Sequence, residues 1–270
     1  MYSSFPKTPF AVFRSVECAT YIFCLIVIAP EKVTMLRGNH EIRAIQSTYS
    51  YHRECLSKYG DEVGEKIWQL TNRIFDTLPL CAVIDGAVFC AHGGIPRSAT
   101  TLEEIAASLP PSIPEPMTES QVAWEILWSD PMSQPQFIDT ARTMQLDVSQ
   151  CGGFLPNRKR GTAWAFGEEA VDRFLAANGL SHIIRAHEVP VCRECFGCSS
   201  ACHLTDNLLF PASQPNGFSF LFSAKCATVF RYVLRYIFQR DFLALISFCL
   251  VALTIVKIKT MPQFYSYLET

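Results

Sequence analysis

The sequence has no marked excess of charge of either sign: its 270 residues include 23 Lys and Arg and 25 Asp and Glu, and the formal net charge is -2. Nucleic-acid-binding domains are usually strongly basic, so this balance gives no electrostatic reason to expect nucleic acid as the main partner. The first residues also lack the basic, apolar and small-residue regions of a secretory signal. A chain of this length is expected to form one large domain, or one domain with a tail.

The cysteines do not indicate a disulfide framework for the whole chain. The 12 cysteines include Cys18, Cys24, Cys81 and Cys90, which stand inside apolar runs. A free thiol in such a run behaves as a small buried hydrophobe. We therefore expect free cysteines, a reducing compartment, and a cytoplasmic or nuclear location.

One short stretch combines a strand pattern with residues suited to chemistry. The run Val33–Leu36 is apolar or β-prone, and Gly38 permits a sharp turn that directs Asn39 and His40 beyond the end of the strand. An isolated Asn-His pair is more often a capping amide and a hydrogen-bonded histidine, so this interpretation needs support from elsewhere in the chain.

Two further histidines provide that support. The segment Cys81–Ala91 contains two apolar runs separated by Asp-Gly, a strong hairpin signal, and His92 follows directly. A second predicted strand leads through two isoleucines to His187. In open α/β sheets, ligands bind beyond the carboxyl ends of the strands, so Asn39, His92 and His187 are expected to converge. One oxygen and two imidazoles suit a divalent metal.

The rest of the pattern predicts helices alternating with strands, which is typical of α/β proteins. Residues 1–13 have no periodicity and are expected to be disordered. Residues 15–29 follow helical spacing but are apolar nearly all round, which indicates a buried helix. Four prolines between positions 110 and 116 predict a surface loop, and residues 132–156 are predicted to be irregular. Further helices are predicted at 41–47, 50–59, 61–75, 102–108, 121–128 and between Gly167 and Gly179.

A basic cluster at Arg158–Arg160 precedes the alternating run that ends at Gly167. Such a cluster is usually a solvated loop. Here the next helix begins with two glutamates, which indicates fixed structure on the C-terminal side of the cluster. An arginine held in this way is able to grip phosphate with two hydrogen bonds.

Five motifs, in order along the chain, carry a resemblance to a known family. They are Leu36-Arg37-Gly38-Asn39-His40-Glu41, His92-Gly93-Gly94, Trp128-Ser129-Asp130-Pro131, Lys159-Arg160-Gly161 and Arg185-Ala186-His187-Glu188. Together they resemble the catalytic subunits of the phosphoprotein phosphatase family, the type-1 and type-2A serine/threonine phosphatases. The resemblance covers roughly residues 14–190. It implies an α/β metallophosphatase (calcineurin-like phosphoesterase) fold, with a central β-sandwich flanked by helices.

The resemblance also implies metal-dependent hydrolysis of phosphoserine and phosphothreonine in proteins. In this family a hydroxide that bridges two metals attacks phosphorus in line, without a covalent phosphoenzyme. Asn39, His92 and His187 match the protein ligands of one metal. His40 matches the general acid that protonates the leaving alkoxide, and Arg160, together with Asn39, matches phosphate-binding groups.

The implied cofactors are divalent ions, with Mn²⁺ favoured over Fe or Zn. The implied partners are phosphoprotein substrates together with regulatory or scaffold subunits. The resemblance leaves two roles open for Trp128, which either lines the substrate groove or packs its own helix.

Two motifs of the family are absent. Family members carry Gly-Asp-x-His-Gly and Gly-Asp-x-x-Asp-Arg-Gly, and neither occurs in these 270 residues. These motifs supply the remaining metal ligands, the Asp that orients the acid histidine, and a second phosphate-binding arginine. The resemblance is therefore N-terminally incomplete, so we expect at most one metal and impaired activity. The alternative function is a catalytically inactive phosphatase-like protein that binds phosphoproteins or regulatory subunits.

The C-terminal part departs from the family as well. We expect a phosphatase-like domain at 14–230 with an insertion at 191–215, followed by a hydrophobic tail at 231–270. Residues 242–256 are apolar except for two hydroxyl residues, but they are fewer than the roughly 20 needed to cross a bilayer. They predict either a membrane-contacting helix or a buried or loosely packed one. An unstructured cysteine-rich loop is favoured over an iron-sulfur or zinc site for the spaced cysteines of the insertion, Cys192, Cys195, Cys198 and Cys202.

Overall fold

The computed structural model describes residues 14–187 and the backbone of residues 253–255. The elements in chain order are α1 (Ser15–Ile28), β1 (Val33–Met35), α2 (Arg43–Tyr49), α3 (Tyr51–Phe75), β2 (Cys81–Ile84), β3 (Val88–Ala91), α4 (Leu102–Ser108), α5 (Pro116–Glu119), α6 (Gln121–Trp128), β4 (Asp130–Pro131), α7 (Gln134–Thr143), the 3-10 helix η1 (Val148–Gln150), β5 (Phe154–Pro156), β6 (Trp164–Phe166), α8 (Glu168–Asn178), β7 (His182–Arg185) and β8 (Leu253–Ile255).

Three small sheets organise the described residues. In the first, β2 and β3 pair antiparallel across a tight turn, and β3 pairs in parallel with β7. The turn residues Asp85 and Gly86 both have positive φ, as the Asp-Gly signal predicts, and Ala87 is a third loop residue between the paired Ile84 and Val88. The second sheet has the order β4-β6-β5, and the third pairs β1 with β8. Because β3 and β7 are parallel, their carboxyl ends meet at one edge.

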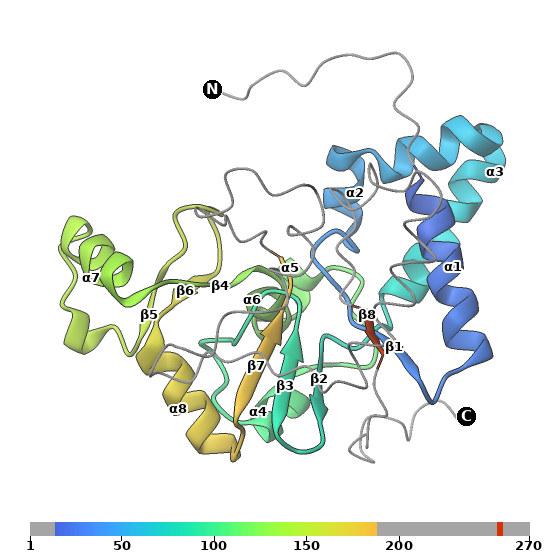
Figure 1. Ribbon diagram of the computed structural model, residues 1–270. Coiled ribbons are helices and arrows are strands. Elements are labelled where there is room, and N and C mark those ends of the chain that lie inside the picture. The colour runs from blue at the N-terminus through green and yellow to red at the C-terminus, as the bar shows by residue number, and fades with distance from the viewer. Residues whose placement is uncertain (1–13, 188–252, 256–270) are drawn as a thin grey trace, which may run out of the picture.

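The main core joins the two three-stranded sheets to α4, α6 and α8. At its centre Phe89 of β3 is fully buried and meets Phe174 of α8 edge-on, with 5.0 Å between the ring centroids. Figure 1 shows α7 and α8 on one side of the central strands, and α1, α2 and α3 on the other. α8 ends at Gly179, whose φ of 63° is the left-handed conformation that glycine adopts at helix ends.

The predicted alternation of strands and helices is confirmed. Two helices, α4 and α6, have the predicted bounds. The two helices predicted at 50–59 and 61–75 form α3, which is bent between them because Gly60 has the non-helical angles φ 77° and ψ 168°.

Two loop predictions were wrong. Residues 132–156 are not irregular, because α7, η1 and β5 lie there. Only Phe137 and Ala141 of α7 are buried, and two apolar positions are too few to reveal a helical period. Within the proline-rich segment, Pro116 begins the single turn of α5, since a proline at the first helical position gives up no helical hydrogen bond.

The prediction of a buried helix at 15–29 was wrong about burial. The helix forms as α1, but Val16 is its only buried residue, and Val27 and Ile28 are 80 % and 78 % exposed. Cys24 is exposed and Cys18 is half-buried, so these two thiols are not core residues either. α1 packs against α3 and β1, and an apolar sequence does not reveal that neighbours cover only part of the helix surface.

The free state predicted for the cysteines is confirmed for those in the described part of the chain. In that same part, no helix is long and apolar enough to cross a membrane. Residues 253–255, which lie inside the apolar stretch predicted to be helical, form strand β8 beside β1, so the helix prediction was wrong there. Residues 1–13, the insertion at 191–215 with its cysteines, and the rest of the tail lie outside the described residues.

The position of Phe89 leads to a prediction about stability. Phe89→Ala should lower the free energy of unfolding by about 3–5 kcal/mol, because it removes a ring from a fully packed core. The measurement is denaturant unfolding followed by circular dichroism. Val27→Ala on the exposed side of α1 is the control and should change stability by less than about 0.5 kcal/mol. Equal losses in the two variants would contradict this description of the core.

Candidate functional site

Three side chains from distant parts of the sequence meet beyond the ends of the strands. The Nε2 atom of His92 lies 2.9 Å from Oδ1 of Asn39 and 3.0 Å from Nδ1 of His187. His92 directly follows β3, His187 follows β7, and Asn39 lies in the loop after β1. All three side chains are almost completely buried. The predicted convergence of these residues is therefore confirmed, while their role as metal ligands stays a prediction.

The separations among these atoms fit a divalent metal. Two ligands bound at right angles, each about 2.1 Å from a metal, lie about 3.0 Å apart. Both imidazoles also favour the neutral form that binds metals. Burial, followed by the charge of Arg160, lowers the pKa of His187 to about 3, and burial lowers the pKa of His92 well below its ordinary value. No group of three His, Cys, Asp or Glu side chains suited to a metal occurs among the described residues, and the third candidate donor here is the amide of Asn39.

The inner nitrogen of His92 lies in a tightly packed place. Its Nδ1 is buried and has no hydrogen-bond partner among the described residues. A Cβ atom on Gly38 would lie 2.8 Å from this nitrogen and 2.6 Å from Oε2 of Glu41. The predicted turn is confirmed, because the Glu41 amide donates a hydrogen bond of 3.3 Å to the Gly38 carbonyl, but Gly38 does not need positive φ to make it. The site requires glycine at position 38 because a side chain there would clash with His92 and Glu41.

Glu41 is itself buried beside these groups. Its Oε2 accepts a hydrogen bond of 2.8 Å from the Gly38 amide, and burial raises the pKa of the carboxyl group to about 7. A metal-binding histidine commonly directs its second ring N–H to a carboxylate. Glu41 is the carboxylate that packs with His92 against Gly38.

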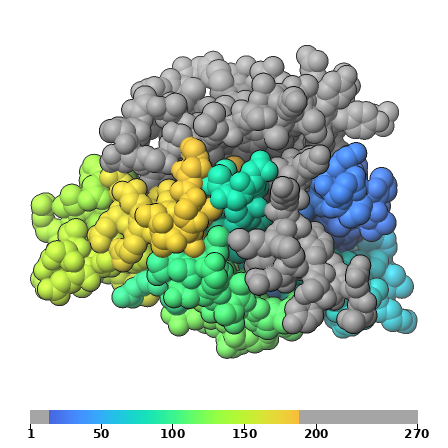
Figure 2. Space-filling model, turned by 90° about the horizontal axis from the view of Figure 1, so that it is seen from below, coloured from blue at the N-terminus to red at the C-terminus, as the bar shows by residue number. Residues whose placement is uncertain are grey.

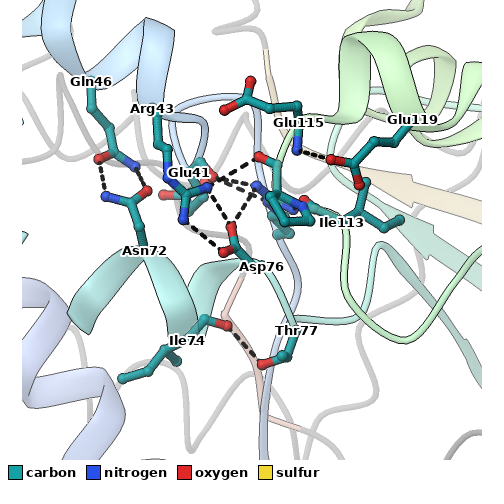
Figure 3. A network of polar contacts seen from close by, with 12 residues as sticks. Glu41, Arg43, Gln46, Asn72, Ile74, Asp76, Thr77, Ile113, Glu115 and Glu119 are labelled. Carbon is teal, nitrogen blue, oxygen red and sulfur yellow. Dashed lines mark hydrogen bonds and ion pairs between the residues drawn. The ribbon is translucent and has the colours of Figure 1, made fainter. Parts of the chain in front are cut away.

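A buried polar network holds the loop that carries Asn39 and His40. The fully buried guanidinium of Arg37 donates two hydrogen bonds, of 2.9 and 3.1 Å, to the Glu41 carbonyl and another to the Ile113 carbonyl. Arg43 donates two hydrogen bonds of 2.7 Å to Asp76 at the end of α3 (Figure 3). Sequence reasoning missed this network, although a charged residue between a buried strand and Gly38 was a signal for it.

A second network surrounds Asp130. This buried carboxylate accepts hydrogen bonds from Arg160 Nε at 2.8 Å, Arg185 Nη2 at 2.6 Å and Asn157 Nδ2 at 3.0 Å. Arg160 also donates to the carbonyl of His187 at 3.3 Å, so the predicted phosphate ligand does lie beside the site. Sequence reasoning assigned no role to Asp130 or Arg185, although both stand in motifs that carry the family resemblance.

His40, the predicted acid, lies half-buried on the same loop. Its ring meets Tyr49 edge-on, with 4.9 Å between the centroids. Burial, followed by the charge of Arg160, lowers the pKa of His40 below its ordinary value. No carboxylate among the described residues pairs with His40, and the neutral form of the ring is therefore favoured near pH 7.

Trp128 packs within its own helix and also contacts a predicted site residue. Its ring packs on Trp124 within α6, at 5.4 Å between centroids, and meets His187 edge-on at 5.6 Å. The side chain is half-buried, and its indole nitrogen has no hydrogen-bond partner within the described ranges of the chain. Trp128 therefore packs its helix and also borders the site.

Comparison with known proteins shows which family the chain belongs to. The family model for calcineurin-like phosphoesterases matches residues 14–191. The chain belongs to that family. Over 177 residues, or 66 % of the chain, it is 34 % identical to a protein phosphatase 2A catalytic subunit from Dictyostelium discoideum, and 35 % identical to a Schizosaccharomyces pombe protein named among the serine/threonine-protein phosphatases. These stretches cover 49 % and 50 % of the two relatives, so the chain spans about half the length of either.

A solved structure of a serine/threonine phosphatase resembles the fold of this chain. A protein serine/threonine phosphatase from Saccharomyces cerevisiae, described as similar to human phosphatase PP5, superposes with a TM-score of 0.52 and 28 % identity. The match covers 65 % of this chain and 48 % of the yeast protein. The metallophosphatase fold and the resemblance to phosphoprotein phosphatases are therefore confirmed, and membership of the family implies divalent metal cofactors.

The charge of Asp130 should stabilise the fold in a pH-dependent way. Burial alone would raise its pKa, but the hydrogen bond from Arg160 and the charge of Arg185 outweigh it and lower the pKa from 3.8 to about 2. Stability from a depressed pKa is present above pH ~4 and is lost as pH falls toward ~2. Denaturant unfolding should show Asp130→Asn losing about 2 kcal/mol or more at pH 6, and the gap to the unmodified chain should shrink by roughly 2 kcal/mol as the pH falls toward 2.

Asp139→Asn is the matched control for this measurement, because Asp139 is exposed on α7. It should change stability by less than about 0.5 kcal/mol at every pH. An Asp130→Asn deficit of the same size at pH 6 and pH 3 would show that its charge is not what matters.

Proposed function

We propose that this chain carries part of the active site of a metal-dependent serine/threonine protein phosphatase, namely the part that holds one divalent metal and one side of the phosphate. The observation that carries the proposal is that Nε2 of His92 lies 2.9 Å from Oδ1 of Asn39 and 3.0 Å from Nδ1 of His187. Relatives that bear the names of serine/threonine phosphatases support the substrate class, which is phosphoserine and phosphothreonine in proteins.

Each residue has a definite task in this proposal. Asn39, His92 and His187 hold the metal, which we propose is Mn²⁺ and at most one ion in this chain. When bound, such an ion stabilises charge on the phosphoryl oxygens and lowers the pKa of the attacking water. Arg160, which contacts Asp130 in the structure, binds a phosphate oxygen of the substrate instead. The phosphate oxygen accepts the same kind of charge-assisted hydrogen bond as the carboxylate. His40 gives its proton to the oxygen of the leaving serine or threonine.

The proposed partners and location follow from this activity. Phosphoproteins are the substrates, and regulatory or scaffold subunits are the further partners that we propose. The free cysteines of the described residues agree with a cytoplasmic or nuclear location, which we also propose.

Metal binding gives the first test. The chain should bind one Mn²⁺, measured by the electron paramagnetic resonance signal of the free ion. His92→Ala should weaken binding at least ~10-fold, because loss of even a supporting group typically costs that much. Mn²⁺ is the probe because it prefers oxygen and imidazole to the thiolates elsewhere in this chain.

His182→Ala is the control for metal binding, because His182 stands at the opposite end of β7. It should bind Mn²⁺ as the unmodified chain does, and circular dichroism should show both variants folded. Equal Mn²⁺ affinity in His92→Ala and His182→Ala would sink the proposed site.

Activity gives the second test. With Mn²⁺, the 270-residue chain should hydrolyse p-nitrophenyl phosphate or phosphoserine peptides at least ~10³-fold more slowly than a complete family member. The reason is that loss of one electrostatic donor to a transition state typically costs about 10²-fold or more, and the family uses a second metal and a second arginine. His40→Ala should change this residual rate little, because without the second metal the transition state that His40 would protonate is not assembled. Rapid turnover that His40→Ala abolishes would show that the chain obtains the other ligands elsewhere.

A further inference from the structure

A cavity of about 230 Å³ lies away from the metal-ligand candidates, between the loop at residues 95–100, the segment at 150–154 and α8. Its lining combines two arginines, Arg97 and Arg173, with the thiol of Cys151 and with apolar side chains such as Phe154 and Phe174. Neither arginine takes part in the networks that hold the metal and phosphate site, so the cavity has no role in the proposed hydrolysis.

The walls of the cavity are fixed before any ligand binds. Gly153 packs so closely on α8 that a Cβ atom there would lie 2.5 Å from the Ala170 amide nitrogen. The Gly153 carbonyl also accepts a hydrogen bond from Gly167, at 2.9 Å. Arg173 donates a hydrogen bond of 2.6 Å to the Gly152 carbonyl, which joins the segment to the helix a second time. Preformed walls of this kind are typical of binding sites.

The charge on the lining is positive. The guanidinium of Arg97 lies 4.1 Å from the centre of the Trp164 ring and has no ion pair within the part of the chain that the structure describes. Stacking on an aromatic face leaves the N–H groups at the edge of the guanidinium able to bind a carboxylate. Arg173 forms an ion pair with Glu169 at 3.1 Å, and about half of its side chain is exposed.

The size of the cavity indicates what it holds. Sites for small molecules usually enclose about 300–1,000 Å³, so this cavity is smaller and suits one or two side chains of a peptide. We propose that it binds an acidic segment of a partner protein, with one apolar side chain against Phe154 and Phe174 and flanking carboxylates on Arg97 and Arg173. The loop at 95–100 begins three residues after His92 in the sequence, although none of the candidate metal ligands lines the cavity.

A labelled peptide tests this proposal directly. Fluorescence anisotropy of the full chain with dye-labelled Glu-Glu-Leu-Glu-Glu should show saturable binding that weakens in 0.5 M NaCl, because surface ion pairs are screened by salt. Arg97→Gln and Arg173→Gln should each weaken binding about threefold, and the double variant about tenfold. Arg142→Gln is the control, because Arg142 is exposed on α7 outside the cavity. A Gln-Gln-Leu-Gln-Gln peptide should bind at least about fivefold more weakly.

Alkylation of Cys151, which lines the cavity, tests independently whether the peptide binds there. The unlabelled peptide should slow alkylation of Cys151, followed by mass spectrometry, without slowing alkylation of the exposed Cys24. Cys24 lies on α1 at the other end of the molecule from α8 (Figure 2). Equal binding of the Gln peptide, an equal loss in Arg142→Gln, or equal protection of both cysteines would overturn the proposal. The assay contains EDTA, so its outcome does not depend on whether the chain binds metal or hydrolyses phosphate.

Discussion

The burial of Arg37 is the constraint on which the site depends most. The loop that follows β1 carries Asn39 and His40 but has no regular secondary structure, so polar contacts must fix its position. A buried guanidinium is tolerated only when its donors are satisfied, and Arg37 satisfies them with the carbonyls of Glu41 and Ile113. The same contacts tie the loop to a segment more than seventy residues further along the chain, so the position of Asn39 is set by tertiary structure.

Asp130 has the corresponding role on the other side of the site. It holds the guanidinium groups of Arg160 and Arg185, and Arg160 in turn contacts the backbone of His187. Burial and the positive charge of Arg160 both keep His187 neutral, which leaves its nitrogen able to bind a metal. The same positive charge attracts a phosphate dianion. One ion-pair network therefore positions both the proposed metal ligand His187 and the proposed phosphate ligand Arg160.

Much of the fold was predictable because its signals are local. Asp85-Gly86 fixes the β2–β3 hairpin, and parallel pairing of β3 with β7 brings His92 and His187 to one edge, as strand order suggested. The failures concern non-local properties. The exposure of Val27 depends on which elements pack against α1, and the importance of Gly38 depends on two side chains that meet beside it. Hydropathy and glycine content carry no information about either.

The structure supports the candidate metal ligands and the candidate acid His40 to different extents. The distance between His92 and His187 follows from the register of β3 and β7, in which Ala91 lies opposite Arg185, and this pairing lies wholly within the described strands. His40 has no comparable support, since its described contact is with the edge of Tyr49, and burial disfavours its charged form. Binding a cation requires neutral, preorganised donors, whereas protonating a leaving alkoxide requires a stabilised imidazolium. The described residues provide neutral, closely spaced donors for the first requirement, and no carboxylate among them stabilises a charged His40.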